Sequence, residues 1–466
     1  MKIQEVSQEI RDMCMTFNRN GEAVGVKDAY VFMYIKAYYQ MFVLSGVVYF
    51  YDNGVYVPDK TGSLLQSIIQ RYIYVDVIKS TTVSRIHKLF FMDEELEKTY
   101  SEINNYPDYW VNFKNGFWDA KSGKIIEHNP KYLAINQIPH EYNPTPINHG
   151  YMDNFLNFAI PNPLNQKMLI QFLAVGCTKD TSFQKFLTLL GSGGNGKSII
   201  IRLAEYIYGE INISNISLSD IDKRFSSIHL LGKLVNSCAD IEVGVLENTS
   251  TLKKLLGEDT VFGEYKGKDG ISFKSYAKLI FSTNVLPTIK GDTSNGFYRR
   301  MLILEMNKKP KKVNPNLFED LLPDIPYLIK RMMDELHEVY TTGEIFVSED
   351  SKKAVEQMNM DSDTAQAFIN ELCCIGEEFK TDRTYLFDKY VSYCNECERQ
   401  PLTRNNFFKA LRTKGFREVR SSNTRYFAGI KVSRTDMEKC HFSDEEEAFL
   451  NVLQEDTPFD VKKVTA

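Results

Sequence analysis

The chain has 466 residues, of which 43% are hydrophobic and 25% charged, and its formal net charge is −5. This length predicts about three domains, and the composition is that of an ordinary globular protein. The negative net charge argues against binding of nucleic acid through overall charge alone, and the apolar runs are too short to span a membrane. No secretory signal is visible at the N-terminus, so we expect a cytoplasmic protein with no membrane partner.

Residues 1–148 are expected to form an N-terminal α+β domain. Apolar residues at helical spacing and β-rich runs around Asp52-Asn53-Gly54 are the main signals. They predict a helix over 3–17, a hairpin over 47–57, helices over 64–73 and 83–89, and short strands over 110–119. A compact module begins near residue 105, and the proline-rich segment 143–146 predicts the boundary that follows.

A second domain is expected over residues 149–345, where strands and helices alternate as in an α/β core. Its predicted elements are helices over 151–160 and 166–175, a strand over 186–190, a helix over 197–208, a strand over 234–239, a helix over 249–256, a hairpin over 260–276, a strand over 277–284 and a helix over 324–340. A looser segment near 345–360 is expected to link this domain to the next.

The most informative stretch is a glycine-rich turn between the apolar run 186–190 and the helix that follows. It reads Gly191, Ser192, Gly193, Gly194, Asn195, Gly196, Lys197, Ser198, which is the phosphate-loop pattern in its required strand–loop–helix context. Glycines let backbone N–H groups surround a phosphate, and the helix directs its positive end at the same anion. Lys197 is suited to the β- and γ-phosphates and the Ser198 hydroxyl to Mg²⁺, so we predict an ATP–Mg²⁺ site.

Nucleotide hydrolysis also needs an acid near the metal, a group that orients water, and a cation for the transition state. Asp240 ends the strand 234–239 and is the candidate metal ligand, while Glu242 is the candidate acid for the water and competes with Glu247. Asn284, at the end of an apolar strand, is expected to hold the water, with a loop-capping role as the alternative. We expect Arg299 or Arg300 to act as an arginine finger; a surface ion pair is the alternative.

Two further groups of cations are candidate DNA contacts. Lys266 and Lys268 lie in the turn of the predicted hairpin, where they would reach into a pore; a merely solvated turn is the alternative. Residues 401–435 carry nine lysines and arginines against Glu418, a charge of +8, and residues 436–466 carry −6. A basic module followed by an acidic tail therefore lies behind the net charge.

The basic module belongs to a C-terminal domain expected over residues 346–435. Helices are predicted over 364–374, 385–397 and 403–414, followed by a hairpin over 416–431. Three helices and a two-stranded wing predict a winged helix-turn-helix whose third helix reads DNA. The cations expected to contact DNA are Arg404, Lys409, Arg412, Lys414 and Arg425.

The eight cysteines are expected to be thiols rather than a disulfide framework. Cys394 and Cys397, with Cys373, Cys374 and Cys440-His441, raise the alternative of a zinc site. The spacing of Cys394 and Cys397 within a helix only places two small residues on one face, and no second Cys-x-x-Cys follows. We therefore predict no metal other than the nucleotide's Mg²⁺.

Taken together, these motifs resemble the superfamily 3 helicases, specifically the primase-helicase branch of phages, plasmids and pathogenicity islands. The resemblance rests on residues 115–119 and 136–139, the phosphate loop, Ala239-Asp240, residues 255–268, residues 281–287 and the Arg299–Arg300 pair. It implies an AAA+ motor that forms a hexameric ring on single-stranded DNA and moves 3′ to 5′ while hydrolysing ATP. It also implies a self-loading initiator for the replication of a mobile element, with host replication proteins as possible partners.

This sequence departs from the family where Ile241 separates the two carboxylates that many relatives carry side by side. No acidic pair or zinc module for a polymerising primase is visible before residue 110, so we expect no primer synthesis. The first 110 residues are expected to bind origin DNA or a partner. The alternative functions are an ATP-switched origin-binding protein or helicase loader without unwinding activity and, less consistent with the arginine pair and the winged helix, a small-molecule kinase.

Overall fold

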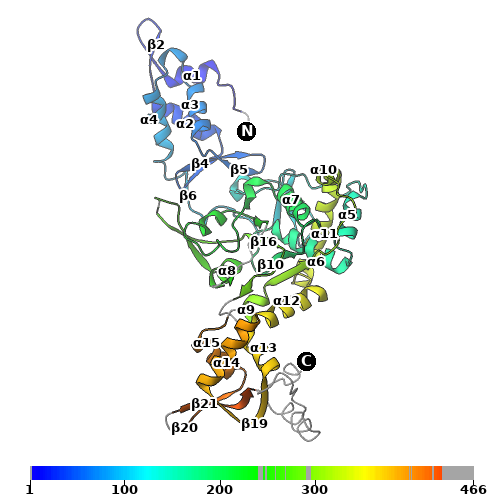
Figure 1. Cartoon of the computed structure of the whole chain (residues 1–466). Coiled ribbons are helices and arrows are strands. Elements are labelled where there is room, and N and C mark those ends of the chain that lie inside the picture. The colour runs from blue at the N-terminus through cyan, green and yellow to red at the C-terminus, as the bar shows by residue number, and fades with distance from the viewer. Residues whose placement is uncertain are drawn as a thin grey trace. The chain divides into compact units, whose positions relative to one another are not determined.

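The computed structural model describes residues 3–239, 245–246, 249–257, 259–267, 269–289, 295–397, 399, 401–421 and 424–432 (Figure 1). The chain divides into two compact units, each of which is made of three separate segments of the sequence. The first unit comprises Met1–Ile241, Thr251–Asn284 and Leu304–Ser348, and the second comprises Glu242–Ser250, Val285–Ile303 and Glu349–Ala466. The domain limits expected from the sequence stay predictions.

The N-terminal part of the first unit packs four helices around an apolar core that includes Val31, Ile35, Leu65 and Ile86. The helices are α1 (Gln8–Cys14), α2 (Asp28–Tyr38), α3 (Ser63–Arg71) and α4 (Ser80–Phe90), with a 3-10 turn η1 (Val75–Val77). The strands are β1 (Met15–Phe17), β2 (Ala23–Val26), β3 (Met41–Leu44), β4 (Val47–Asp52), β5 (Val55–Pro58) and β6 (Glu97–Lys98), in a pair β1-β2 and a sheet of order β5-β4-β3-β6.

Two local expectations are decided here. The hairpin β4–β5 is confirmed: Asn53 and Gly54 have φ values of 48° and 93°, which is the twist that a two-residue turn between right-twisted strands requires. The helix predicted as far as Phe17 is wrong at its end, because Met15 is extended and pairs with Val26. Pairing with a residue eleven positions later therefore overrides the helical spacing.

Next in the chain comes a small antiparallel sheet of order β7-β8-β9, whose first two strands were expected. Its elements are β7 (Trp110–Phe113), β8 (Gly116–Asp119), β9 (Ile125–Ile126) and the 3-10 turn η2 (Pro130–Tyr132). Phe117, Tyr106 and Ala134 are buried between them.

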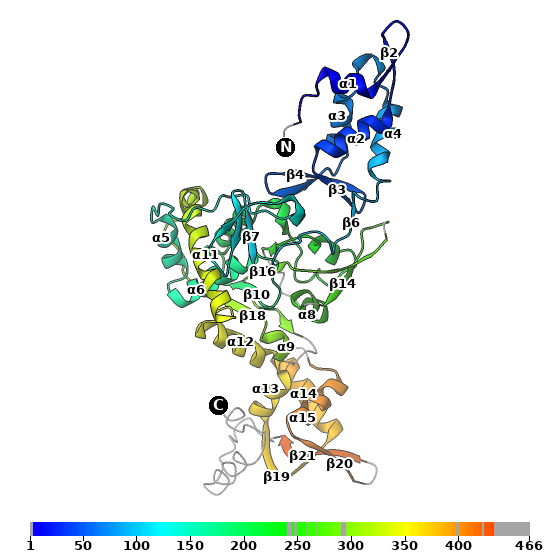
Figure 2. The same cartoon turned by 180° about the vertical axis from the view of Figure 1, so that it is seen from behind.

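A five-stranded sheet with parallel pairing is the centre of the chain, which confirms the expected α/β class (Figure 2). Its strands are β10 (Phe186–Leu190), β11 (Ile213–Ser214), β12 (Val235–Cys238), β16 (Lys278–Thr283) and β18 (Met301–Glu305), in the order β11-β12-β16-β10-β18. The surrounding helices are α5 (Tyr151–Ala159), α6 (Pro163–Gly176), α7 (Lys197–Tyr208), α8 (Ser250–Leu256), α10 (Leu317–Leu321) and α11 (Ile325–Thr342). Nearly every residue of β10 and β16 is buried, as expected of strands covered on both faces.

Each of the two units also contains short elements. They are the 3-10 turns η3 (Glu210–Asn212), η4 (Ser227–Leu230) and η5 (Leu322–Asp324), the strand pairs β13 (Val245–Leu246) with β17 (Thr288–Ile289) and β14 (Thr260–Gly263) with β15 (Ile271–Lys274), and the helix α9 (Asn295–Tyr298). The pair β14–β15 confirms the hairpin expected over 260–276.

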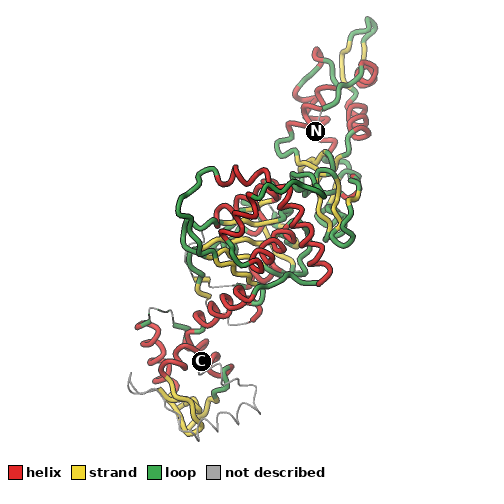
Figure 3. The backbone as a smooth tube through the Cα atoms, turned by 90° about the vertical axis from the view of Figure 1, so that its right-hand side faces the viewer, coloured by secondary structure: helices red, strands yellow, loops and turns green. Residues whose placement is uncertain are grey.

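The C-terminal part contains the four helices α12 (Glu349–Ser362), α13 (Thr364–Leu372), α14 (Arg383–Glu396) and α15 (Arg404–Thr413) and the three strands β19 (Cys373–Asp382), β20 (Arg417–Ser421) and β21 (Thr424–Val432) (Figure 3). The looser segment expected near 345–360 is wrong, because most of it forms α12. The expected two-stranded wing is also incomplete, because β19 adds a third strand in the order β19-β21-β20. Phe368, Tyr390 and Phe407 are at the centre of a core shared by α13, α14 and α15.

Candidate functional site

The phosphate-loop sequence lies at the end of β10, with α7 directly after it. β10 and β16 pair in parallel from Leu187 opposite Ile280 to Leu190 opposite Thr283, so both strands end at the same edge of the sheet. Gly194 and Gly196 have φ values of 78° and 93°, a conformation that favours glycine. The expected strand–loop–helix context is therefore present in the structure.

Gly191 fixes the entry to the loop by close contact. A Cβ on Gly191 would be 2.2 Å from the carbonyl oxygen of Met306, so no other residue fits without a shift of the backbone. The N–H of Met306 donates to the Leu190 carbonyl at 2.7 Å, and the Asn195 amide donates to the Met306 carbonyl. The loop is thus held on one side by the chain that leaves β18. By contrast, a Cβ on Gly193 or Gly194 would meet no atom within 4 Å, so the loop is open on its outer side.

Lys197 and Asn284 meet at the mouth of this loop. The Lys197 ammonium donates to Asn284 Oδ1 at 3.2 Å and also to the Gly191 carbonyl, and the lysine is 5% exposed. Asn284 is exposed and follows β16 directly, and the Thr283 carbonyl beside it accepts the Gly191 N–H at 3.2 Å. A lysine and an asparagine that are 87 residues apart in sequence therefore share one small region. Ser192 and Ser198 are both exposed there.

The helix after the loop is anchored to the strand that precedes the acidic candidates. On α7, Glu205 accepts a hydrogen bond from Ser237 Oγ on β12 at 3.1 Å. β12 pairs in parallel with β16 and ends at Cys238, so the chain leaves it at the same edge of the sheet as the loop. Asp240 and Glu242 follow but lie outside the described residues, and their predicted roles stay predictions.

Asn136 is a structural residue that was not among the site residues expected from the sequence. Its side-chain N–H₂ donates to Asn212 Oδ1 at 2.8 Å and to the Gly232 carbonyl at 2.9 Å. Its Oδ1 accepts from Asn104 Nδ2 at 3.0 Å and from the Tyr276 hydroxyl at 2.7 Å. All four hydrogen-bonding positions of a 2%-exposed amide are thus filled. These bonds join the segment after η2 to residues flanking β11, β12 and β16, so the small sheet and the central sheet are linked.

The structure describes one of the two lysines expected in the hairpin turn. Lys266 is exposed in the turn between β14 and β15, as expected, whereas Lys268 lies outside the described residues. Ser227 Oγ donates to the Phe262 carbonyl at 2.9 Å, and the ring of His229 contacts that of Tyr265. These contacts attach the hairpin to η4.

Arg299 and Arg300 belong to the second compact unit. Arg299 is exposed, and Arg300 is half-buried and donates to the Gly296 carbonyl in α9. The exposed Arg299 is therefore the more accessible of the two guanidinium groups.

The basic residues of the C-terminal part divide into two groups. Arg404 and Lys409 are exposed on α15, where the Arg404 guanidinium also donates to Thr384 Oγ1 at 2.7 Å. Arg412 and Arg425 are also exposed but, together with Arg383, make ion pairs with Glu418. Burial of the Glu418 carboxylate raises its pKa, and the hydrogen bonds and charges of Arg383 and Arg412 outweigh this effect, so the pKa of Glu418 is lowered. Lys414 pairs with Asp363 at 2.6 Å. Arg412, Lys414 and Arg425 thus have a structural partner besides the expected DNA contact.

Within the described part of the chain, no group of three or more potential metal-ligating side chains is close enough to hold an ion. Cys394 is buried in the core of the C-terminal part, whereas Cys397 is exposed. No described helix combines the length and apolar character that crossing a membrane would require.

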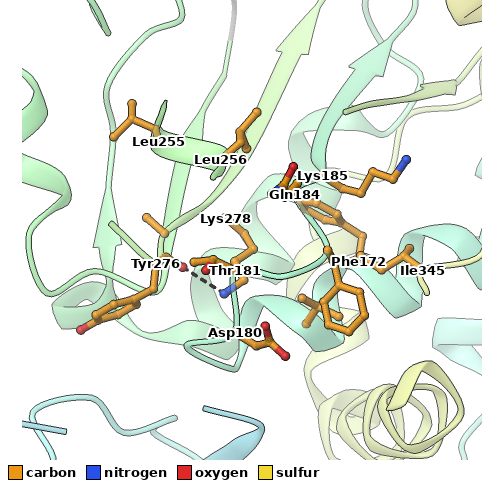
Figure 4. Close-up of a pocket in the computed structure, with 13 residues that line it drawn as sticks. Phe172, Asp180, Thr181, Gln184, Lys185, Leu255, Leu256, Tyr276, Lys278 and Ile345 are labelled. Carbon is orange, nitrogen blue, oxygen red and sulfur yellow. Dashed lines mark hydrogen bonds between the residues drawn. The ribbon is translucent and has the colours of Figure 1, made fainter. Parts of the chain in front are cut away.

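A buried lysine lies at the opposite end of β16 from the loop. Lys278 donates to the Thr178 carbonyl at 2.8 Å. It also donates to the Tyr276 carbonyl at 3.0 Å, the bond drawn as a dashed line in Figure 4. Burial lowers the pKa of Lys278 to about 7, although the carboxylates of Asp180 and Asp108 act in the other direction. The cavity beside it has a volume of about 20 Å³, which is too small for a substrate.

Two family models and one viral protein match parts of the chain. Residues 75–187 match a family described as "D5 N terminal like", and residues 189–300 match a "Family of unknown function (DUF5906)". A protein of Acanthamoeba polyphaga mimivirus named "Putative helicase" is 26% identical over 219 residues, which are 43% of this chain and 22% of that protein. The chain therefore spans about a fifth of the length of this relative.

Solved structures with a similar fold cover more of the chain. Two structures, each named the A form apo structure of the NrS-1 C terminal region, are similar to this chain with TM-scores of 0.50 and 14% sequence identity. Each match covers 86% of this chain, and the two matches cover 98% and 99% of the NrS-1 chains. At this identity the similarity establishes the fold, and the chemistry rests on the residues described above.

Proposed function

We propose that this chain is an ATP-hydrolysing DNA helicase that works in the replication of a mobile genetic element. The observation that carries the proposal is the meeting of Lys197, at the start of α7, with Asn284, directly after β16, at the mouth of a phosphate loop whose strand β10 pairs in parallel with β16. The similarity to a mimivirus protein with helicase in its name supports DNA unwinding as the use of that site.

The residues of the loop fit a nucleoside triphosphate and its metal ion. The open outer side at Gly193 and Gly194 leaves room for phosphate, and the exposed Ser198 hydroxyl is at the positive end of the twelve-residue helix α7. The Lys197 ammonium donates to the Gly191 carbonyl, Asn195 Oδ1 and Asn284 Oδ1, and a γ-phosphate would be a stronger acceptor than these neutral oxygens. Mg²⁺, held by Ser198 and Asp240, would neutralise phosphate charge.

In this proposal, each remaining residue has one role. Asn284, released from Lys197, would orient the attacking water, and the acid would be Glu242. Arg299 or Arg300 would reach the nucleotide of a neighbouring subunit in a hexameric AAA+ ring. Lys266 and Lys268 would contact single-stranded DNA, and the C-terminal helices and sheet would act as a winged helix on duplex DNA. The motor would move 3′ to 5′.

The experiment is the unwinding of forked DNA with either a 3′ or a 5′ single-stranded tail, in the presence of ATP and Mg²⁺. We expect displacement from the 3′-tailed fork by the unaltered chain and none by Lys197→Ala. The matched control Lys311→Ala removes an exposed lysine from a loop and should leave unwinding unchanged. ATP hydrolysis stimulated by DNA without displacement would replace the helicase with a loader or origin binder.

A further inference from the structure

The hairpin β14–β15 presents an aromatic ring to solvent where sheet alternation would allow a polar residue. Phe262 is 61% exposed, while its neighbours Val261 and Gly263 are buried. The register pairs Phe262 with Ser272 and Thr260 with Lys274, so these four side chains share one face of the hairpin. Thr260, Ser272 and Lys274 are exposed as well. The apolar ring is therefore part of an otherwise polar and basic face.

The position of the ring is defined by the turn. A Cβ on Gly270 would be 2.0 Å from the ring Cζ of Phe262, so the far end of the ring rests directly on the Gly270 backbone. Gly270 is not among the glycines with positive φ, and the ring lies over the space that a Cβ at this position would occupy. An exposed side chain held in one place loses less conformational entropy when a partner stacks on it.

A cavity adjoins the same face of the hairpin. It has a volume of about 400 Å³, and Ser272 and Lys274 form one side of it. Ser101, Asp108 and Lys179 line its other side, where the Lys179 ammonium pairs with Asp108 at 3.0 Å. This volume is in the range of sites that accept one small-molecule-sized group, so the face adjoins a space large enough for a nucleoside.

The charges near the ring favour an anionic partner that carries flat rings. Lys274 is a diagonal neighbour of Phe262, and Lys266 is exposed in the turn. Glu264 is paired with Arg224, which reduces its effect on an anion. Asp259 and Asp269 are exposed at the two ends of the hairpin and limit the attraction of phosphate by charge alone. A partner that gains from stacking as well as from charge therefore fits best.

We propose that Phe262 is a base-stacking residue for single-stranded DNA, with Lys274 and Lys266 holding the flanking phosphates and the adjoining cavity receiving the next base. Stacking on an aromatic ring is tolerant of sequence because every base has a π-face, which suits a chain that moves along DNA. This inference rests on the proposed function and adds the chemistry by which the hairpin holds its substrate. The hairpin is the green ribbon labelled β14 in Figure 2.

The test compares two labelled oligonucleotides of equal length, about 16 nucleotides, by fluorescence anisotropy. One is oligothymidylate and the other has abasic sites throughout, so it keeps the phosphates and lacks the rings. We expect the full-length chain to prefer oligothymidylate. Phe262→Ala should weaken binding of oligothymidylate about five- to 150-fold and leave binding of the abasic strand unchanged, whereas Lys266→Ala should weaken both.

Further variants separate stacking from hydrophobic contact and from a structural role. Phe262→Leu should behave as Phe262→Ala does, and Phe262→Trp should restore binding, with tryptophan emission quenched by oligothymidylate. Basal ATP hydrolysis should not change in any of the three. The inference is overturned if Phe262→Ala weakens binding of oligothymidylate and of the abasic strand equally, or weakens neither. It is also overturned if Phe262→Ala changes the oligomer mass while the preference for oligothymidylate stays the same, because the ring would then lie between two copies of the chain.

Failure of this inference is distinguishable from failure of the proposed function. If the unaltered chain binds oligothymidylate and unwinds forked DNA while Phe262→Ala does both equally well, only the stacking role is wrong. If the unaltered chain binds neither strand, both are wrong.

Discussion

Asn136 gives the sharpest prediction about stability, because its amide is fully satisfied within the protein. Replacing it by alanine removes four side-chain hydrogen bonds. Asn212 Oδ1 and the Gly232 carbonyl lose a donor, whereas Asn104 and Tyr276 still bond to each other at 3.1 Å. At about 1 kcal/mol for each lost bond, with the larger cost falling on the two buried acceptors, we expect Asn136→Ala to lower the free energy of unfolding by about 4 kcal/mol.

The sequence provides a local reporter for this change. The chain has two tryptophans, Trp110 on β7 and Trp118 on β8, and the neighbouring Asn112 on β7 donates to the Asn136 carbonyl at 2.8 Å. Urea unfolding followed by tryptophan emission therefore reports on the region that Asn136 joins. With a slope of about 2 kcal/mol per molar urea, the midpoint should fall by about 2 M.

A matched control replaces an exposed asparagine on α15, as Asn405→Ala, and should leave the midpoint where it was. Asn136→Asp is a stricter test, because the carboxylate keeps the two acceptor positions and replaces the two donors with charged oxygen facing two oxygens. We expect it to be at least as destabilising as alanine. A loss below about 1 kcal/mol for Asn136→Ala would show that the network does not hold these segments together.

Three further predictions concern the site and its strand. Asn284→Ala should lower kcat for ATP hydrolysis about 100-fold with nucleotide affinity nearly unchanged, measured by steady-state hydrolysis and nucleotide titration; an equal rise in Kd would show a binding role instead. Gly191→Ala should abolish nucleotide binding, because its Cβ would be 2.2 Å from the Met306 carbonyl, whereas Gly193→Ala, which meets no atom within 4 Å, should retain it. Burial lowers the pKa of Lys278 to about 7 in the folded chain, from 10.5 when unfolded. Because the unfolded chain therefore binds more protons between these two pH values, the free energy of unfolding should rise with pH across that window. Urea midpoints that rise equally in Lys278→Met would contradict this assignment.

Local signals were sufficient for much of the fold. The phosphate loop, the hairpin at Asn53-Gly54 and the buried strand before Asn284 depend on residues adjacent in sequence, and each lies where the sequence predicts it. β19 and the end of α1 were missed because pairing between strands decides them: Cys373 pairs with Val432, 59 positions later. α12 was taken for a linker, since its sequence is polar and shows little helical patterning, with few buried side chains.

The site shows the same division. The residue types around the nucleotide follow from the motif, but the contact of Lys197 with Asn284 depends on β16 lying beside β10, which periodicity does not reveal. The network at Asn136 joins residues up to 140 positions apart. The exposure of the Phe262 ring could have been predicted from the sequence, because Phe262 occupies an alternating position opposite Ser272 in a predicted hairpin.

The placement of β16 has a mechanical consequence. Asn284 follows its last residue, and its first residue, Lys278, comes four positions after the end of β15 in the hairpin. β16 is paired on both sides, with β10 and β12, so it cannot slide by one residue without breaking two ladders at once. Six residues of strand span about 20 Å. A displacement of β16 at the phosphate loop would therefore be transmitted along the strand to its hairpin end with little loss.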